Sequence, residues 1–170
     1  MNNFRASLAT LDDIDAVHAL LARAGEGLAT LGFNNWVPAY PRERLVESVQ
    51  ARALWVVRDE GTGKLQATYT LRTTPIHPYG EFGWGTLGQE VRYLGRLAVD
   101  PAMQGTGIGR WCLRHVATEC TREGVASVRC DVLSANNKLR RFYERFGFVA
   151  RGEREHSGWR FTVYELMLAR

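Results

Sequence analysis

Three glycines alternate with other residues in the segment QGTGIG, residues 104–109, which lies between an apolar run and a stretch with helical spacing. Glycine has no side chain to shield the backbone, and the first N–H groups of a helix carry partial positive charge that attracts anions. The segment therefore indicates a site for a phosphate or pyrophosphate group. An ordinary strand-to-helix turn can have the same composition, so the segment alone leaves both interpretations open.

Two other glycine motifs fit this segment poorly. A P-loop, G-x-x-x-x-G-K-S/T, needs a lysine and a hydroxyl after its last glycine, whereas Arg110 and Trp111 follow here. A dinucleotide fingerprint, G-x-G-x-x-G, would place its third glycine at Arg110 or Cys112. Asp131 nevertheless lies about where such a site places a ribose-binding carboxylate, which keeps a NAD-type interpretation open.

A second segment, NNKLRRFYERFGF at residues 136–148, places Asn136 seven positions before Tyr143 and ends with a Gly-Phe pair. Taken alone, its aromatic residues are typical of a hydrophobic core, because they share one helical face. The basic residues of the segment then form the solvated face of the same helix. We therefore expect no nucleic-acid partner.

Together, the two segments resemble the GNAT superfamily of N-acetyltransferases, which bind acetyl-coenzyme A. Gln104, Gly107 and Gly109 match the family pattern Q/R-x-x-G-x-G/A, after a strand that ends in Val99-Asp100-Pro101. The asparagine and tyrosine of the second segment match the spacing of a later family motif. The sequences FNNWVPAYP and YLGRLAV are also similar to those of small bacterial-type acetyltransferases. The resemblance covers most of the chain and is specific over residues 94–148.

The resemblance implies acetyl-CoA as cosubstrate, no metal, and a set of backbone and side-chain groups that bind the cosubstrate. Main-chain groups of the strand would contact the pantetheine arm and the acetyl group, the glycine loop would hold the pyrophosphate, and the asparagine would bind the arm. The residues implied are Leu97, Ala98, Val99, Gln104, Gly105, Thr106, Gly107, Ile108, Gly109, Arg110, Asn136 and Tyr143.

Two residues are expected to act in the transfer itself. The resemblance implies that a backbone N–H near Val99 stabilises the developing oxyanion, and that Tyr143 protonates the departing thiolate. The acceptor amine would attack directly, with no acyl-enzyme. The general base stays unassigned, because the strand VRYLGRLAV contains no carboxylate. Glu81, Glu90, His77 and His156 are candidates, and the two glutamates are at least as typical of a solvated surface.

The acceptor is expected to be the amine of a small molecule, an amino-acid derivative or a peptide. Two loops rich in aromatic residues should flank its pocket in this fold, residues 27–40 with Trp36 and Tyr40, and residues 73–89. These aromatic residues could instead pack the loops or join two copies of the chain, so a homodimer stays open. A non-catalytic acyl-CoA-binding module of the same fold is the alternative function.

The apolar periodicity predicts the elements that position these residues, in the order β-α-α-β-β-β-α-β-α-β-β. Thr10 and Asp13 form a predicted capping box before a helix with Ile14, Val17 and Leu20 on one face. Residues 25–41 are predicted as a loop, and helices are predicted at 42–51, 108–123 and 136–145. The fold class is mixed α/β, with a mostly antiparallel sheet of about six or seven strands flanked by about four helices, in a single domain over residues 1–170.

Composition sets the remaining limits. No stretch of the 170 residues approaches the roughly 18 consecutive apolar residues of a membrane span. The first residues do not read as a secretory signal, so neither a membrane nor a secreted location is expected. The net charge of +4 suits an anionic ligand. Three cysteines without C-x-x-C spacing are typical of free thiols in a reducing cytoplasm: Cys112, Cys120 and Cys130.

Overall fold

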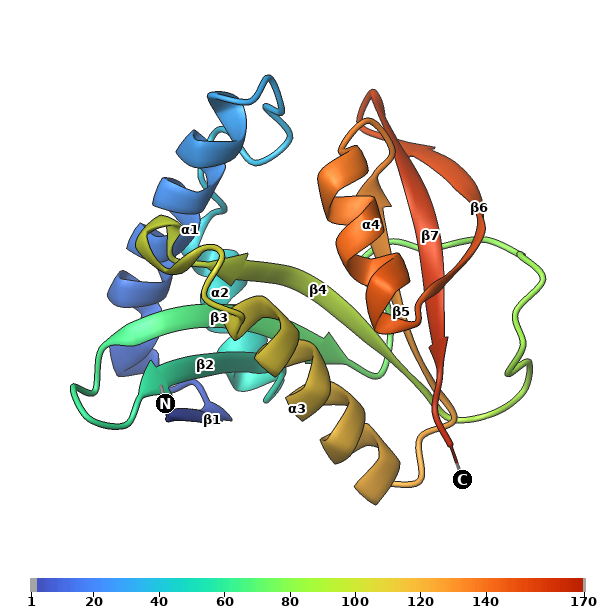
Figure 1. Cartoon of the computed structure of the whole chain (residues 1–170), viewed down its shortest axis with the longest axis horizontal. Helices are drawn as coiled ribbons and strands as arrows, with labels where there is room; N and C mark the ends of the chain where they lie inside the picture. Colours follow the sequence, from blue (N-terminus) through green and yellow to red (C-terminus); the bar gives the residue numbers. More distant parts are fainter. Residues whose placement is uncertain (1–2, 170) are drawn as a thin grey trace. The chain divides into compact units, whose positions relative to one another are not determined.

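The computed structural model describes residues 3–169, within which seven strands form one sheet with four α-helices (Figure 1). The strands are β1 (Phe4–Leu8), β2 (Leu54–Asp59), β3 (Leu65–Arg72), β4 (Val91–Val99), β5 (Ser127–Leu133), β6 (Val149–His156) and β7 (Trp159–Met167). The helices are α1 (Ile14–Ala29), α2 (Arg42–Gln50), α3 (Ile108–Arg122) and α4 (Asn137–Phe146). The strand order is β1-β2-β3-β4-β5-β7-β6, so the predicted element order and fold class are confirmed.

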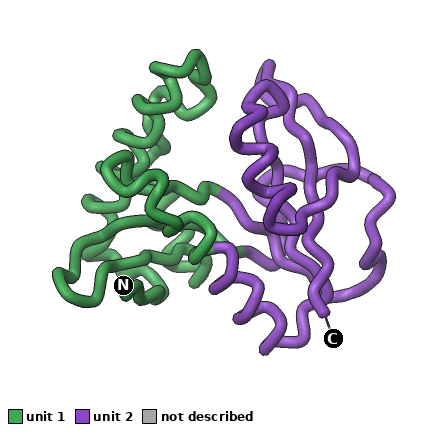
Figure 2. Tube along the Cα trace, in the orientation of Figure 1, with its two compact units in different colours: residues 1–71, 96–112 green, residues 72–95, 113–170 purple. Residues whose placement is uncertain are grey.

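The chain divides into two compact units, coloured separately in Figure 2. Unit 1 comprises residues 1–71 and 96–112, and unit 2 comprises residues 72–95 and 113–170. Strand β4 and helix α3 each contribute residues to both units. The glycine loop therefore belongs to unit 1, whereas Asn136 and Tyr143 belong to unit 2.

In unit 1, helices α1 and α2 share a buried core with β2, β3 and the end of β4, and β1 pairs antiparallel with β2. The predicted capping box is present, since the Thr10 backbone N–H donates to the Asp13 carboxylate at 2.8 Å. It begins a short 3-10 turn, Leu11–Asp13, that leads directly into α1. The apolar face predicted for this helix is buried, with Val17 and Leu20 fully inaccessible to solvent.

Helix α1 continues beyond the point where the sequence predicted a loop. The predicted loop began at residue 25, but the helix runs on through Gly25 and Gly27 to Ala29, so the prediction for residues 25–29 was wrong. Gly25 is buried in the helix because the chain crosses it closely. A Cβ atom at this position would lie 2.7 Å from the Trp36 carbonyl oxygen. The glycine that suggested a loop therefore serves helix–loop packing.

In unit 2, β5 is the central strand. It pairs in parallel with β4 over residues 91–93 and antiparallel with β7 over its whole length. Strand β7 continues the sheet to β6 through an antiparallel hairpin. Helix α4 ends at Gly147, whose φ of +119° is a left-handed conformation that glycine adopts readily at a helix C-terminus.

None of the helices in the described part of the chain is both long and apolar enough to cross a bilayer. Likewise, residues 3–169 contain no cluster of three or more His, Cys, Asp or Glu side chains that could hold a metal ion.

Candidate functional site

The loop between β4 and α3 has a backbone that only glycine adopts without strain. Gly105 and Gly107 have φ angles of +82° and +89°. A Cβ atom on either residue would meet nothing within 4 Å. The backbone conformation therefore explains why these two residues are glycines, and close packing against a neighbour does not. The absence of side chains leaves open space above the backbone.

Helix α3 begins inside this loop. The Trp111 N–H donates to the Gly107 carbonyl at 3.0 Å, which makes the first bond of the helix. The N–H groups before it, on Ile108, Gly109 and Arg110, precede the helical ladder and carry the positive end of the helix dipole. Gln104, Gly105, Thr106, Gly107 and Arg110 are exposed, whereas Ile108 is buried and anchors the helix start.

Asp100 fixes the start of the loop. Its carboxylate accepts a bond from the Ala102 N–H at 3.0 Å and from the Arg23 guanidinium at 2.8 Å. Its own N–H donates to the Gln66 carbonyl at 2.8 Å, which ties the end of β4 to β3. The carboxylate is buried, which by itself raises its pKa, but the bonds from Ala102 and Arg23 outweigh burial and the pKa is lowered.

The end of β4 contains the other backbone groups predicted for the site. Ala98 is buried in the core of unit 1, and Leu97 and Val99 are half-buried. These residues and the glycine loop all belong to unit 1.

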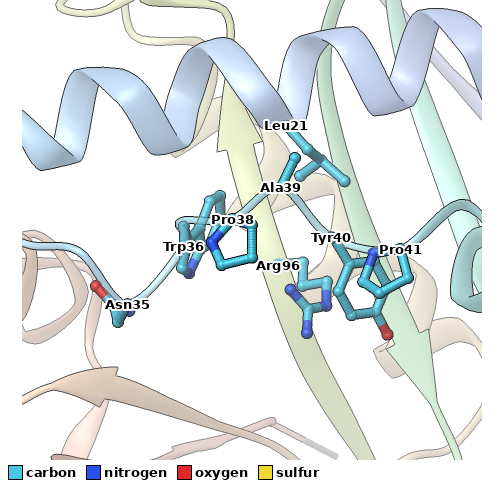
Figure 3. A pocket seen from close by; sticks show the side chains of 8 residues that line it. All are labelled: Leu21, Asn35, Trp36, Pro38, Ala39, Tyr40, Pro41 and Arg96. Carbon is cyan, nitrogen blue, oxygen red and sulfur yellow. The ribbon is translucent and has the colours of Figure 1, made fainter.

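A cavity of about 180 Å³ lies in unit 1, beside Arg96 of β4 (Figure 3). Six of its eight lining residues belong to the segment 35–41, including Trp36 and Tyr40, which were predicted to contact the acceptor. Leu21 of α1 and Arg96 complete the lining. The Arg96 guanidinium carbon lies 3.2 Å from the centroid of the Tyr40 ring, so the two planar groups are in close contact.

The sequence analysis did not single out Arg96, although a signal was present: it is the one charged residue in the stretch LGRLAV, residues 94–99. Its φ of +51° is unusual for a residue other than glycine and breaks the extended backbone of β4 at this point. Such conformations are concentrated at functional sites.

Asn136 is buried and forms the N-cap of α4 in unit 2. Its side-chain Oδ1 accepts the Leu139 N–H at 3.0 Å. Because the cap occupies the oxygen, the amide NH₂ group is the part of this side chain that can donate to a ligand.

Tyr143 lies on the buried face of α4, only 6% exposed. Its ring makes an edge contact with Phe148, with centroids 5.2 Å apart, and stacks on Tyr164 at 6.4 Å. Tyr143 and Phe148 are thus part of a hydrophobic core, which is what the sequence of this segment, taken alone, predicts. Core packing fixes the ring and is compatible with a reactive hydroxyl at its edge.

The candidate bases are on the surface of unit 2. Glu81 is exposed, and Glu90 is exposed with its carboxylate 2.9 Å from Arg92. His77 and His156 contact each other, with ring centroids 4.0 Å apart. Their proximity is an arrangement that the sequence did not predict.

A buried cluster around Glu165 of β7 was also missed. This carboxylate is inaccessible to solvent and accepts bonds from Thr86 Oγ1 at 2.5 Å, from Ser127 Oγ at 2.9 Å and from the Gly85 N–H at 2.8 Å. Arg151 lies 2.9 Å away and completes its environment. Burial alone would raise the pKa of Glu165, but the bonds and the nearby guanidinium charges lower it. A glutamate inside an apolar strand was the available signal.

This cluster anchors the loop of residues 73–89. The Arg129 guanidinium, which bonds to Glu165, also lies 4.1 Å from the Trp84 ring centroid. Tyr79 contacts Tyr93 edge to face at 5.4 Å. Tyr79 and Trp84 thus pack this loop against strands β4 and β5.

The three cysteines are free and buried. Burial raises the pKa of Cys112 and of Cys120 to about 12, so neither thiol ionises readily near neutral pH.

Comparison with known proteins identifies relatives along most of the chain. An uncharacterized N-acetyltransferase of Bacillus subtilis is 26% identical over 155 residues, covering 89% of this chain and 84% of its own. The S-(2-succino)cysteine N-acetyltransferase of the same organism is 26% identical over 162 residues, covering 94% and 93%. The crystal structure of a GNAT-family acetyltransferase from Streptococcus agalactiae superposes with a TM-score of 0.82 at 18% identity, covering 98% of this chain and 96% of that one.

The family model for the acetyltransferase (GNAT) family matches residues 19–148. The matched range contains the cavity segment, the glycine loop and helix α4 with Asn136 and Tyr143. The chain therefore belongs to the acetyltransferase (GNAT) family and is an enzyme of the N-acetyltransferase type.

Proposed function

We propose that this enzyme uses acetyl-CoA as the acetyl donor. The acceptor is the primary amine of a small molecule, an amino-acid derivative or a peptide, and this amine attacks the acetyl group directly. Family membership supports the donor. The relative named for S-(2-succino)cysteine supports an acceptor derived from an amino acid.

The conformation of the glycine loop carries the proposal. Gly105 and Gly107 hold positive φ angles with open space where a side chain would stand, immediately before the start of α3. Bare N–H groups at a helix start are a suitable site for a pyrophosphate. The exposed Arg110 side chain adds a cation next to these groups. The residues present therefore fit the phosphates of acetyl-CoA.

Three further groups of the chain have roles in this proposal. When bound, acetyl-CoA supplies an activated thioester. The Val99 N–H stabilises negative charge that develops on the carbonyl oxygen, and a donor of this kind contributes about 3 kcal/mol in other enzymes. The Asn136 amide donates to the pantetheine arm. The Tyr143 hydroxyl gives a proton to the departing thiolate, whose basicity is close to that of a phenol.

The test is a calorimetric titration with acetyl-CoA, with NAD and ATP as controls, followed by an assay of thiol release with a panel of amines. We expect selective binding of acetyl-CoA and release of CoA that depends on the amine. Tighter binding of NAD would contradict the proposal and favour the dinucleotide interpretation based on Asp131. Binding without thiol release for any amine would support a non-catalytic module.

A further inference from the structure

The cavity beside Arg96 has mostly apolar walls. Its lining includes Leu21, Trp36, Tyr40 and two prolines, and none of the described residues that line it is acidic. Asn35 is the one lining residue with an amide side chain, and Figure 3 shows it beyond Trp36, apart from the other labelled side chains. A polar group of a ligand would therefore find few partners in this cavity, and burial of a polar group without a partner is costly.

Arg96 contributes to the lining while its guanidinium rests on a ring. The Cζ atom lies 3.2 Å from the centroid of the Tyr40 ring, a contact that stabilises the positive charge. A second cation, such as the ammonium group of a lysine side chain or of a polyamine, would meet a like charge here with no acidic lining residue to offset it. An uncharged apolar group needs only van der Waals contact with the walls and no bond from Arg96.

The size of the cavity sets the size of the group that it can hold. Its volume is about 180 Å³. An apolar cavity of about 150 Å³, engineered in another protein, binds benzene. The cavity therefore has room for one group of the size of a leucine or phenylalanine side chain.

The cavity lies close to the proposed position of the acetyl group, within unit 1. Arg96 lines the cavity, and Val99, whose N–H is proposed to stabilise the oxyanion, follows three residues later in β4. Three residues of strand correspond to at most about 10 Å. A small acceptor with only a few bonds between its amine and its apolar group can reach both positions.

We infer that the acceptor is a small amine that carries an uncharged apolar group, aliphatic or aromatic, and that this group occupies the cavity. This inference rests on the proposed function, because it assigns the acceptor class to the same site. The cavity contributes binding and orientation, and its residues take no part in proton transfer. Specificity arises because polar or charged groups lose their hydration on entry and gain few partners.

The test compares acceptors that differ only in the side group. Leucine, phenylalanine, alanine, asparagine, lysine and glutamate are assayed as L-amino acids, as their α-carboxamides and as tripeptides with two following glycines, using CoA release as readout. Within the context that is used best, kcat/KM for leucine should exceed that for alanine by about 50-fold, which is roughly fourfold for each of three buried carbons. Asparagine, which has nearly the shape of leucine, should be no better than alanine. Lysine and glutamate should be the poorest acceptors.

Variants of the lining assign the preference to the cavity. Ala39→Leu fills part of the cavity and should reduce the leucine-to-alanine ratio to near one. Trp36→Ala removes a wall and should also lower this ratio. Ala51→Leu is the matched control, since Ala51 is an exposed residue at the end of α2 outside the cavity, and it should keep the full ratio. Circular dichroism and acetyl-CoA affinity verify that each variant is folded.

Separate measurements distinguish failure of the inference from failure of the proposed function. Acetyl-CoA affinity, measured by calorimetry, tests the donor alone. If amines are acetylated but leucine and phenylalanine are not preferred in any context, or if both cavity variants keep the preference, the inference is overturned.

If acetyl-CoA does not bind, or if no amine is acetylated, direct titration with L-phenylalaninamide decides the inference. Binding that Ala39→Leu weakens and Ala51→Leu retains supports the apolar site. Absence of binding, or binding that both variants retain, overturns it.

Discussion

Arg23 on helix α1 lies 2.8 Å from Asp100, the residue at which the glycine loop begins. The same carboxylate accepts the Ala102 N–H, so one side chain joins a helix to the first turn of the loop. Because Asp100 is buried and Arg23 is half exposed, the bond is stronger than a surface ion pair but is still partly screened.

Replacing Asp100 should therefore loosen the loop. Asp100→Ala removes both bonds and should lower the free energy of unfolding by about 2 kcal/mol, whereas Asp100→Asn keeps one acceptor oxygen and should cost less. Both should weaken acetyl-CoA binding through the loop. Chemical denaturation and calorimetry measure the two effects. Asp15→Asn, at an ion-paired carboxylate that is 83% exposed, is the control and should change neither.

The proposed role of the glycine loop in phosphate binding can be tested by comparing two glycines that share a conformation. Gly107 and Gly63, in the β2–β3 turn, both have positive φ and open space at the Cβ position. Glutamate at either position should destabilise the fold by about 1–2 kcal/mol, from left-handed strain. Gly107→Glu alone should also abolish acetyl-CoA binding, because the side chain brings a negative charge to the proposed phosphate site. Equal affinity in the two variants would refute the loop assignment.

Asn136 caps helix α4, and substitution can separate this role from its proposed role in binding acetyl-CoA. Asn136→Asp keeps an oxygen for the Leu139 N–H, so α4 should remain capped, but it removes the NH₂ donor proposed for the pantetheine arm. We expect unchanged thermal stability and weaker acetyl-CoA binding. Asn136→Ala removes both groups and should additionally cost about 1 kcal/mol of stability. If Asn136→Asp binds acetyl-CoA normally, this residue is only a cap.

The helices and their ends could be predicted from the sequence because the residues that determine them are close together in the chain. The capping box at Thr10, the apolar face of α1 and the Gly147 terminus of α4 each depend on residues within a few positions of one another. The element order and fold class followed from the resemblance to a known family and from the alternation of elements.

The missed features depend on residues far apart in the chain. Glu165 bonds to Thr86, 79 positions away, and Arg96 lies on Tyr40 across 56 positions of sequence. No periodicity links such partners before the chain folds. The error at Gly25 has the same origin, since the reason for the glycine is a carbonyl group of Trp36.

Tyr143→Phe tests the proposed acid without disturbing the core. The ring contacts with Phe148 and Tyr164 do not need the hydroxyl, so the fold and acetyl-CoA affinity should be kept while kcat falls about 10²-fold or more. Tyr164→Phe is the control, because its hydroxyl donates to Glu144 at 2.8 Å in a structural role. It should lose some stability and keep kcat. Full activity of Tyr143→Phe would remove this tyrosine from the mechanism.

Glu165 should make stability depend on acid pH. Its pKa in the folded state lies below the ordinary value of 4.5, so its stabilising contribution is complete above about pH 4.5 and is lost as the pH falls through the lower folded value. Glu165→Gln should cost about 3–5 kcal/mol near neutral pH, because it leaves two arginines without their buried partner. The difference from the wild type should shrink below pH 4. Glu155→Gln, at a 74% exposed carboxylate, should show neither effect.

The close approach of Gly25 to Trp36 means that the shape of the cavity is set partly by a residue that does not line it. A methyl group at position 25 would lie 2.7 Å from the Trp36 carbonyl oxygen and 3.3 Å from its Cβ atom, and so would displace one wall of the cavity without changing a single residue that lines it. A substitution on the buried face of a helix can therefore reshape this cavity and leave every residue that lines it unchanged.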